Sequence, residues 1–391
     1  MGLILAAVDV YARPTLPADI APAIGNTRWV TLLCRYADAT DVTPQPRSFF
    51  EGLMGDAYPG MGDYWRENSY GQLDFTNDVV LGWFDLPLTR EEYFIPAFDF
   101  YNNHAIVNDC MGTADDQINF PDFYGVAVFL NVPYDIGRPT AVVDNRITEG
   151  GFLPFDRDGA TKEYGFFMMS PGSSQPLTVA DPGILAHETG HAYGLFHTSN
   201  GSSSFDTMSG IGCTEHPEFG CVSNHVAAIQ KDLLGWIPPE RKLTVHSGMY
   251  VDVQLSRLAL PSEEGVLMVK VPIFGSETEF YTVESRHAIG YDNALIFPHA
   301  PQLTAFVVIH RVNINTSAED WADLRRTGVE YWLPGERFVS TETCVAIIVR
   351  KQTELGHKVS VESSEPPCPN IGRREASILP IILPLILEDE E

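Results

Sequence analysis

The sequence predicts an α+β protein in which a mixed α/β part is followed by a β-rich part. Up to about Pro238, strand-like apolar runs alternate with helix-like stretches. Beyond Pro238, short runs rich in β-branched and aromatic residues are separated by Gly, Pro, Asn or charged turns. The 391 residues are also too many for one small domain and allow two or three.

Four segments follow from this pattern. We expect an N-terminal arm over 1–27, a mixed α/β domain over 28–237, a β-sandwich-like domain over 238–370 and a tail over 371–391. The tail contains the apolar run ILPIILPLIL (378–387), which has ten residues and two prolines. A helix needs about 20 apolar residues to cross a bilayer, so no transmembrane segment is predicted.

The elements of the two domains follow from periodicity and capping residues. The expected strands of the mixed domain are 28–38, 74–86, 123–133 and 164–170, and its expected helices are 59–73, 88–111 with a break near Pro96, 178–194, and 223–236 with Ser223 as its cap. The β-rich runs are 240–258, 265–274, 278–287, 305–313, 337–352 and 358–363. Their spacing predicts an antiparallel sandwich or sheet.

Composition and charge argue against several classes of protein. Hydrophobic residues make up 44% of the chain and charged residues 20%, which is typical of folded domains rather than disordered chains. The 52 acidic and 25 basic side chains give a formal charge of −27, which repels phosphate backbones and anionic lipid surfaces. Nucleic acid is therefore not expected as a partner. A solvated acidic surface is favoured over a role in steering substrates.

The cysteines form an even set with no CxxC pair: Cys34, Cys110, Cys213, Cys221, Cys344 and Cys368. An even number permits three disulfides and so favours an oxidising compartment. Cys213 and Cys221 lie closest in the sequence and have turn-forming Gly and Pro residues nearby, so they are the best candidate pair. Cys344 with Cys368 and Cys34 with Cys110 would follow by elimination, with buried free thiols as the alternative.

The segment HETGHAYGLFH (187–197) holds three of the eleven histidines of the chain. Asp181 is suited to be the N-cap of a helix through this segment, and Pro182 to be its first residue. His187 and His191 are four positions apart, so both imidazoles project from one face of that helix on successive turns.

The third histidine reaches the same place by a different route. Gly194 can adopt a positive φ, so it would end the helix and turn the chain back. His197 would then return to the two histidines on the helix. Three neutral imidazoles with one open position are typical of a catalytic zinc site, because a structural site is closed by a fourth protein ligand. Histidines packed inside a core are the alternative, which these spacings disfavour.

Glu188 is expected to be a general base rather than a ligand. It lies about 100° around the helix from His187, too far to share the ion but able to reach a molecule on the open side. A zinc ion in such a site polarises a carbonyl and makes water acidic enough to lose a proton near neutral pH. Glu188 would take that proton and pass it to the leaving amine.

Met208 follows eleven residues after His197, within FDTMSG (205–210). The string HExxHxxGxxH followed by such a methionine turn is the metzincin signature. We expect Met208 beneath the three imidazoles as an apolar floor, with ordinary core packing as the alternative.

Several motifs together resemble the immune inhibitor A group of secreted metallopeptidases and, more loosely, the gametolysin-type enzymes. They span roughly residues 28 to 315 and are GDYWRENSYGQL, LGWF, the histidine string, FDTMSG, AAIQKDLLGW and YTVESRHAIGYD. The resemblance implies a secreted endopeptidase that acts on proteins or peptides, with a metzincin-like catalytic domain followed by a β domain. It also implies the zinc ligands His187, His191 and His197, the base Glu188 and the turn methionine Met208.

One residue departs from the pattern of that group, and one further cofactor is considered. Some metzincins carry a tyrosine two residues after the methionine, but Gly210 stands there, so the group that stabilises the oxyanion is unassigned. A calcium ion is the second cofactor considered, because DRDG (156–159) matches a fragment of a calcium-binding loop. The other spaced ligands of such a loop are missing, so an ordinary turn is favoured.

The sequence also predicts the surroundings of three side chains outside the histidine string. Glu284 and Arg286 point the same way along a predicted strand, so we expect a structural pair rather than contacts with substrate. His225 lies near the start of a predicted helix and is expected to be exposed.

Two alternatives to a peptidase stay open. Another zinc amide hydrolase, such as an amidase or deacylase, would use the same metal chemistry. A binding or adhesion protein would act through its β-rich domain and keep a vestigial metal site, but the intact Glu188 argues against it. A secreted protein is expected, although the first 22 residues lack a basic residue before their apolar run and do not resemble a signal peptide.

Overall fold

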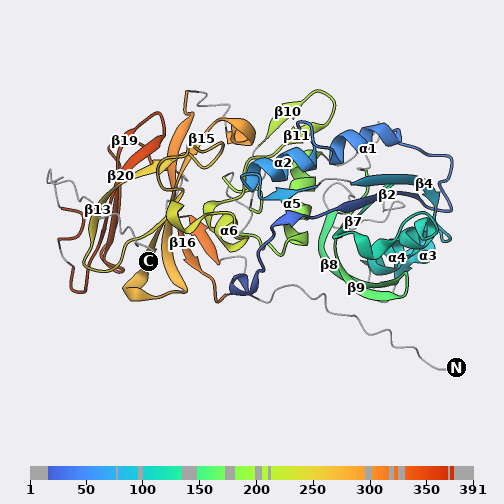
Figure 1. Cartoon of the computed structure of the whole chain (residues 1–391), viewed down its shortest axis with the longest axis horizontal. Coiled ribbons are helices and arrows are strands. Elements are labelled where there is room, and N and C mark those ends of the chain that lie inside the picture. The colour runs from blue at the N-terminus through green and yellow to red at the C-terminus, as the bar shows by residue number, and fades with distance from the viewer. Residues whose placement is uncertain are drawn as a thin grey trace, which may run out of the picture.

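The computed structural model describes residues 16–75, 78–95, 100–133, 148–171, 181–198, 205–209, 213–295, 302–316, 321–324, 331–368 and 370–373. Their helices and strands form an elongated molecule with two parts along its long axis (Figure 1). One part is built around a mixed sheet and the other from two further sheets. The predicted α+β class is therefore confirmed at the level of helices and separate sheets.

The first part contains a five-stranded sheet. Its strands are β2 (Trp29–Arg35), β4 (Val79–Asp85), β7 (Gly125–Leu130), β8 (Thr148–Arg157) and β9 (Ala160–Met169). Their order is β4-β2-β7-β9-β8, and every neighbouring pair is parallel except the β8–β9 hairpin. The apolar runs of β2 and β7 are buried almost along their whole length, as expected for parallel strands covered on both faces.

Helices cover both faces of this sheet. They are α1 (Arg47–Met54), α2 (Met61–Asn68), α3 (Arg90–Tyr93), α4 (Asn103–Ala114) and α5 (Pro182–Ala192), and α6 (Ala228–Leu233) follows later in the chain. Successive side chains of a strand point to opposite faces. On β2, Trp29 and Leu33 pack with residues of α1, α2 and α5, whereas Val30 and Leu32 pack with residues of α4. This alternation fixes the face of the sheet on which α5 lies.

The second part consists of two sheets that share one core. Its strands are β12 (Lys242–Thr244), β13 (Tyr250–Ser256), β14 (Met268–Pro272), β15 (Glu279–His287), β16 (Ala305–Asn313), β17 (Ala322–Leu324), β18 (Arg337–Ser340), β19 (Val345–Gln352) and β20 (Gly356–Ser363). The sheet orders are β12-β14-β15-β16-β17 and β13-β20-β19-β18. Val283 and Ile309 of the first sheet pack with Val253 and Val361 of the second. All six predicted β-rich runs contain strands.

The remaining elements are short. They are the strands β1 (Gly25–Asn26), β3 (Leu73–Asp74), β5 (Phe94–Ile95), β6 (Phe100–Tyr101), β10 (Thr214–His216) and β11 (Gly220–Val222), and the 3-10 helices η1 (Pro17–Asp19), η2 (Phe120–Asp122), η3 (Pro239–Arg241), η4 (Ile273–Gly275) and η5 (Gly290–Leu295). The helix expected over 88–111 is thus divided into α3 and α4, with β5 and β6 between them.

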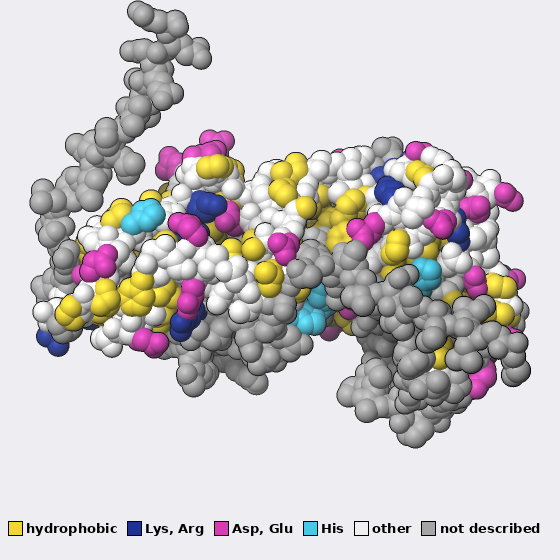
Figure 2. All heavy atoms as spheres, turned by 90° about the horizontal axis from the view of Figure 1, so that it is seen from below, with side chains coloured by type: hydrophobic (Ala, Val, Ile, Leu, Met, Phe, Trp, Pro, Cys, Tyr) yellow, Lys and Arg dark blue, Asp and Glu magenta, His cyan; other side chains and the backbone are white. Residues whose placement is uncertain are grey.

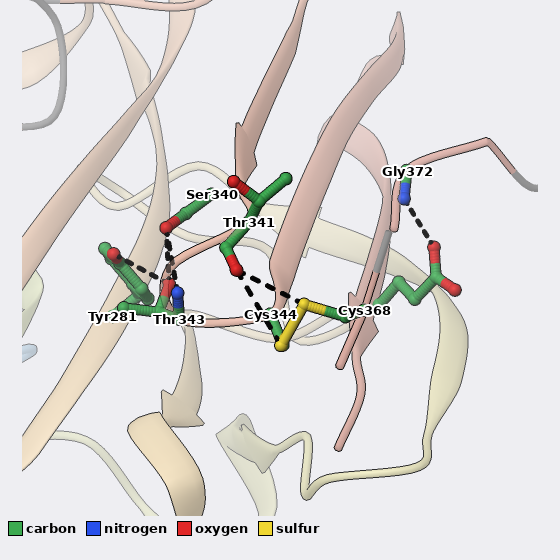
Figure 3. The surroundings of a disulfide bond; sticks show 8 residues. Tyr281, Ser340, Thr341, Thr343, Cys344, Cys368 and Gly372 are labelled. Carbon is green, nitrogen blue, oxygen red and sulfur yellow. Dashed lines mark hydrogen bonds between the residues drawn. A yellow bond between two sulfur atoms is a disulfide. The ribbon is translucent and has the colours of Figure 1, made fainter. Parts of the chain in front are cut away.

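All three predicted disulfide pairs are confirmed. Cys34–Cys110 joins β2 to α4, and Cys213–Cys221 closes the β10–β11 hairpin. Cys344–Cys368 joins the start of β19 to the chain after β20 (Figure 3).

Figure 3 also shows a link between the two sheets of the sandwich beside that disulfide. The Tyr281 hydroxyl on β15 lies 3.1 Å from the hydroxyl of Thr343, which precedes β19 in the other sheet. Thr343 in turn donates to the hydroxyl of Ser340 at 2.7 Å. These bonds hold the β18–β19 turn against β15.

The expected cap of the helix over 223–236 is wrong. Helix α6 begins at Ala228, after the N-cap position Ala227, so Ser223 lies well before it. The Ser223 hydroxyl instead lies 2.9 Å from the hydroxyl of Thr207, and both are buried. A buried hydroxyl needs a hydrogen-bond partner, and this tertiary partner replaces the expected capping bond.

Strand β8 was not expected from the sequence. Its buried Leu153 and Phe155 alternate with exposed Pro154 and Asp156, which is the pattern of a half-buried strand. A proline cannot donate to a ladder, and it is tolerated here because β8 lies at the edge of the sheet.

The segment boundaries near residues 28, 238 and 370 stay predictions. Most of the N-terminal arm (1–15) and most of the tail (374–391) lie outside the described residues. Among the described residues, no helix is both long enough and apolar enough to cross a membrane.

Candidate metal centre

Helix α5 begins at Pro182, as the Asp181 cap predicts, and ends at Ala192, two residues before the expected Gly194. The Asp181 side chain accepts a hydrogen bond from the Ile184 N–H at 3.1 Å, and Pro182 occupies the first turn, where its missing N–H leaves no bond unmade. After Ala192 the chain passes through Gly194, whose φ of +86° lies in the left-handed region. The Leu195 N–H then donates back to the Gly190 carbonyl at 3.0 Å, which closes the end of the helix.

This turn brings the three histidines together. The Nε2 atoms of His187 and His191 are 3.2 Å apart, and each lies 3.1 Å from the Nε2 atom of His197. Nitrogen ligands about 2.0–2.1 Å from a tetrahedral ion lie about 3.3 Å from one another, so the triangle fits such an ion. The three side chains are partly exposed, and together they could hold a metal ion.

Two backbone carbonyls orient the imidazoles. His187 Nδ1 lies 2.8 Å from the Thr207 carbonyl oxygen, and His191 Nδ1 lies 2.8 Å from that of Leu195. A carbonyl only accepts, so each Nδ1 carries the proton and each Nε2 keeps its lone pair for a metal. Burial lowers the pKa of His187 to about 4, against the opposing effect of the Thr207 carbonyl. The ring is therefore neutral at neutral pH, as a ligand must be.

Met208 packs against the helix that carries two of the histidines. It is fully buried, and a Cβ atom added to Gly190 would lie 2.4 Å from the Met208 sulfur. The sulfur therefore contacts the helix backbone one residue before His191. Its predicted place beneath all three imidazoles stays a prediction.

Glu188 lies next to His187 on α5 and is 6% exposed. A buried carboxylate on a helix beside two candidate ligands is a notable feature, because burial of a charge is costly unless the group has partners or a function. Its role as general base stays a prediction.

Sequence reasoning missed the residues that hold the methionine turn. Asp206 is fully buried and accepts from the Met208 N–H at 3.1 Å and from the Thr198 hydroxyl at 2.5 Å. Burial raises the pKa of Asp206 to about 6. The Tyr64 hydroxyl of α2 lies 2.9 Å from that of Thr207. Asp206 lies directly before Thr207 and Met208, so its position in FDTMSG is the sequence feature that could have predicted its role in holding the turn.

The Glu284–Arg286 pair is confirmed, and it is part of a larger buried cluster. Arg286 Nη1 lies 3.0 Å from Glu284 and Arg286 Nη2 lies 2.6 Å from Asp292, and all three side chains are fully buried. Arg286 also donates to the carbonyl oxygens of Phe205 and His225. These bonds join the second part of the molecule to the methionine turn.

The expectation that His225 is exposed is wrong. Its ring is fully buried, with Nε2 2.8 Å from Glu67 Oε1 and Nδ1 3.0 Å from Lys231 Nζ. Burial, reinforced by the charge of Lys231, lowers the pKa of His225 well below its usual range. The histidine therefore stays neutral inside this cluster, with Nδ1 accepting from the lysine.

The DRDG segment forms the turn of the β8–β9 hairpin. Asp156 accepts from the Thr161 hydroxyl at 2.5 Å, and Asp158 accepts from the Phe120 N–H at 2.8 Å. Asp158 and Gly159 both have positive φ, of 51° and 76°. The Asp156 bond closes the turn, and the Asp158 bond ties the turn to η2. Gly210, which stands where some metzincins carry a tyrosine, lies outside the described residues.

Acidic side chains are scattered among the described residues of one face. Figure 2 shows them there interspersed with apolar and basic side chains rather than gathered in one patch.

Two sequence comparisons were made, with known protein families and with curated proteins. No model of a known protein family matches the chain, and no curated protein is significantly similar to it. Functional inference therefore rests on the histidine site itself.

Proposed function

We propose that this chain is a secreted zinc endopeptidase of the metzincin type, similar to the immune inhibitor A group. The observation that carries the proposal is the triangle of imidazole Nε2 atoms, 3.1–3.2 Å apart. The two anchored Nδ1 atoms and the contact of Met208 with Gly190 support it further. Zinc is favoured as the metal because three neutral imidazoles with an open position suit its catalytic sites.

In the proposed mechanism, His187, His191 and His197 hold zinc through Nε2. When bound, zinc polarises the substrate carbonyl and activates water for attack. Glu188 accepts a proton from the attacking water as the water oxygen bonds to the carbonyl carbon. The same carboxyl group then gives the proton to the departing nitrogen as the C–N bond breaks. Glu188 is 6% exposed, so little of the carboxylate is in contact with bulk water.

An extended peptide is the proposed substrate. Helix α5, which carries His187 and His191, packs against β8 and β9 at the edge of the sheet. Within the described part of the chain, β8 has a hydrogen-bonded neighbour on one side only. The open side of an edge strand can pair with an extended segment through backbone hydrogen bonds, which suits a substrate of varied sequence. This geometry favours an endopeptidase over an amidase of small molecules.

The proposed extracellular location rests on the disulfides. Three disulfides that each join separate elements are typical of oxidising compartments and rare in the cytosol.

The proposal is tested by incubating the full chain with denatured casein, with and without a zinc chelator. We expect new peptide ends without the chelator, loss of cleavage with it, and recovery on adding zinc. If the zinc-loaded chain leaves casein and a mixture of unfolded proteins intact, the peptidase proposal is wrong. Release of ammonia or an acyl group from small amides would then support the other zinc hydrolases.

A further inference from the structure

The second part of the molecule reaches the candidate metal centre through Trp321. This residue directly precedes β17, is fully buried, and donates its Nε1–H to the carbonyl oxygen of His197 at 2.7 Å. The two residues are 124 positions apart. The third candidate ligand is therefore held by a side chain from the sheet that contains β15, β16 and β17.

His197 depends on such a contact more than the other two histidines do. His187 and His191 lie on α5, where the helix fixes the backbone. His197 lies beyond the helix, and residues 195–198 belong to no helix or strand. The position of the His197 backbone is fixed by the turn at Gly194, which precedes it, and by tertiary hydrogen bonds to its own segment. Besides Trp321, Gln230 of α6 contributes a longer bond of 3.4 Å to the Phe196 carbonyl.

A second contact from the same sheet reaches the segment that orients His187, another candidate ligand. Arg286 of β15 donates to the Phe205 carbonyl, and its guanidinium is fixed by Asp292 at 2.6 and 2.8 Å and by Glu284 at 3.0 Å. Two residues after Phe205, the Thr207 carbonyl accepts from His187 Nδ1 at 2.8 Å. The sheet thus holds the segment that orients His187.

We propose that the sheet β12-β14-β15-β16-β17 helps to hold the metal centre in place, and that Trp321 and Arg286 are positioning residues for His197 and His187. Holding the ligands in place before the metal arrives lowers the ordering cost of binding and fixes the ligand geometry. The inference concerns the metal centre and not peptide cleavage, so it holds even if the chain binds zinc and cleaves nothing.

Trp321 gives the sharper test because its hydrogen bond can be removed while most of its packing is kept. Trp321→Phe loses the N–H donor and leaves an aromatic ring among Ala227, Ile229 and Phe280. Trp236→Phe is a matched control: Trp236 is also fully buried and donates to a backbone carbonyl, that of Ala23, at the same distance of 2.7 Å.

Three measurements separate positioning from general stability. They are the zinc Kd by competition with a chromophoric chelator, the visible spectrum of the cobalt-substituted protein, and the melting temperature of the metal-free protein. We expect both variants to lower the melting temperature of the metal-free protein. Only Trp321→Phe should also weaken zinc binding, by about 10- to 100-fold as for other residues that orient ligands, and change the cobalt bands.

The same pair of positions can be tested with no change of shape. Replacing each tryptophan in turn by benzothienylalanine, an isostere without the N–H, removes the donor and keeps the bicyclic ring. We expect weaker zinc binding for the replacement at Trp321 and the parental Kd for that at Trp236. Parental zinc affinity and cobalt spectrum in both Trp321 variants would overturn the proposal. Equal losses of affinity at the two positions would overturn it as well.

Discussion

The imidazole of His187 donates from Nδ1 to the backbone carbonyl of Thr207, the residue directly before Met208, across 2.8 Å. This bond couples the helix that carries two candidate ligands to the methionine turn. It fixes the tautomer of His187, because a carbonyl can only accept. The methionine turn thus has a polar role in orienting a candidate ligand, in addition to the contact of the Met208 sulfur with α5.

Glu188→Gln should abolish proteolysis and leave zinc in place. The amide keeps the length of the side chain but cannot take a proton from water, while the three histidines are unchanged. General-base catalysis contributes about 10²- to 10⁴-fold, so kcat should fall by at least that factor. Cleavage rate and zinc content are measured together.

His191→Ala is the matched comparison for that variant. It removes a candidate ligand, so both the zinc content and the cleavage rate should fall. Cleavage by Glu188→Gln at the parental rate would show that Glu188 is not the base.

Gly190→Ala should destabilise the protein through Met208. The new Cβ would lie 2.4 Å from the sulfur of the buried Met208, so that side chain must move. Overpacking of this kind costs about 1–3 kcal/mol, and we expect the displaced Met208 to disturb its turn and so weaken zinc binding. Thermal unfolding of the metal-free protein and the zinc Kd are the measurements.

Gly112→Ala is the control for that substitution. Gly112 also lies inside a helix, α4, but the nearest atom to its added Cβ is the Arg157 Nη2, at 3.7 Å. Alanine is the better helix former by about 0.5–1 kcal/mol, so this variant should gain stability. If both alanine variants shift the unfolding temperature equally, Met208 does not clash with a Cβ atom at position 190.

Stability should fall in acid partly because of His357. Burial, together with the charge of His287, lowers the pKa of His357 to about 4, below the 6.5 of an unperturbed histidine. Between these pH values the unfolded chain binds more protons than the folded chain, so this contribution to stability is lost as pH falls from about 6.5 to 4. The full shift corresponds to an upper limit of about 3 kcal/mol.

His357→Gln tests this contribution, since glutamine does not titrate. The free energy of unfolding is measured from pH 7 to pH 4 in the presence of a chelator, so that metal loss plays no part. The variant should lose less stability in acid than the parent. His246, which is exposed in the folded chain, serves as the control position. Identical pH dependence of parent and His357→Gln would contradict the prediction.

The Cys213–Cys221 disulfide should stabilise the β10–β11 hairpin, which follows the methionine turn. It closes a short loop, with a sequence separation of 8, for which the chain-entropy estimate is about 2–3 kcal/mol. Replacing both cysteines by serine should lower the free energy of unfolding by about that amount. Peptide mapping without reduction is the direct check, and two free thiols in the mature protein would remove the claim.

Much of the candidate site could be predicted because its geometry is local. The four-residue spacing of His187 and His191, the cap at Asp181 and the turn at Gly194 are properties of one short segment. A helix has a fixed pitch, so spacing alone determines which side chains share a face.

Only the tertiary structure decided which distant groups hold that segment in place. The sequence placed Ser223 at a helix start and His225 at the surface, yet both are buried, in contact with Thr207 and Glu67 respectively. Trp321 reaches His197 from 124 residues away, and no periodicity encodes such a contact. Local spacing is set by the backbone within a few residues, whereas long-range contacts depend on how the sheets pack. The sequence by itself therefore predicted the three candidate metal-binding histidines, whereas the packing of the second part against the first determined which side chains, Trp321 and Arg286, hold the backbone around them.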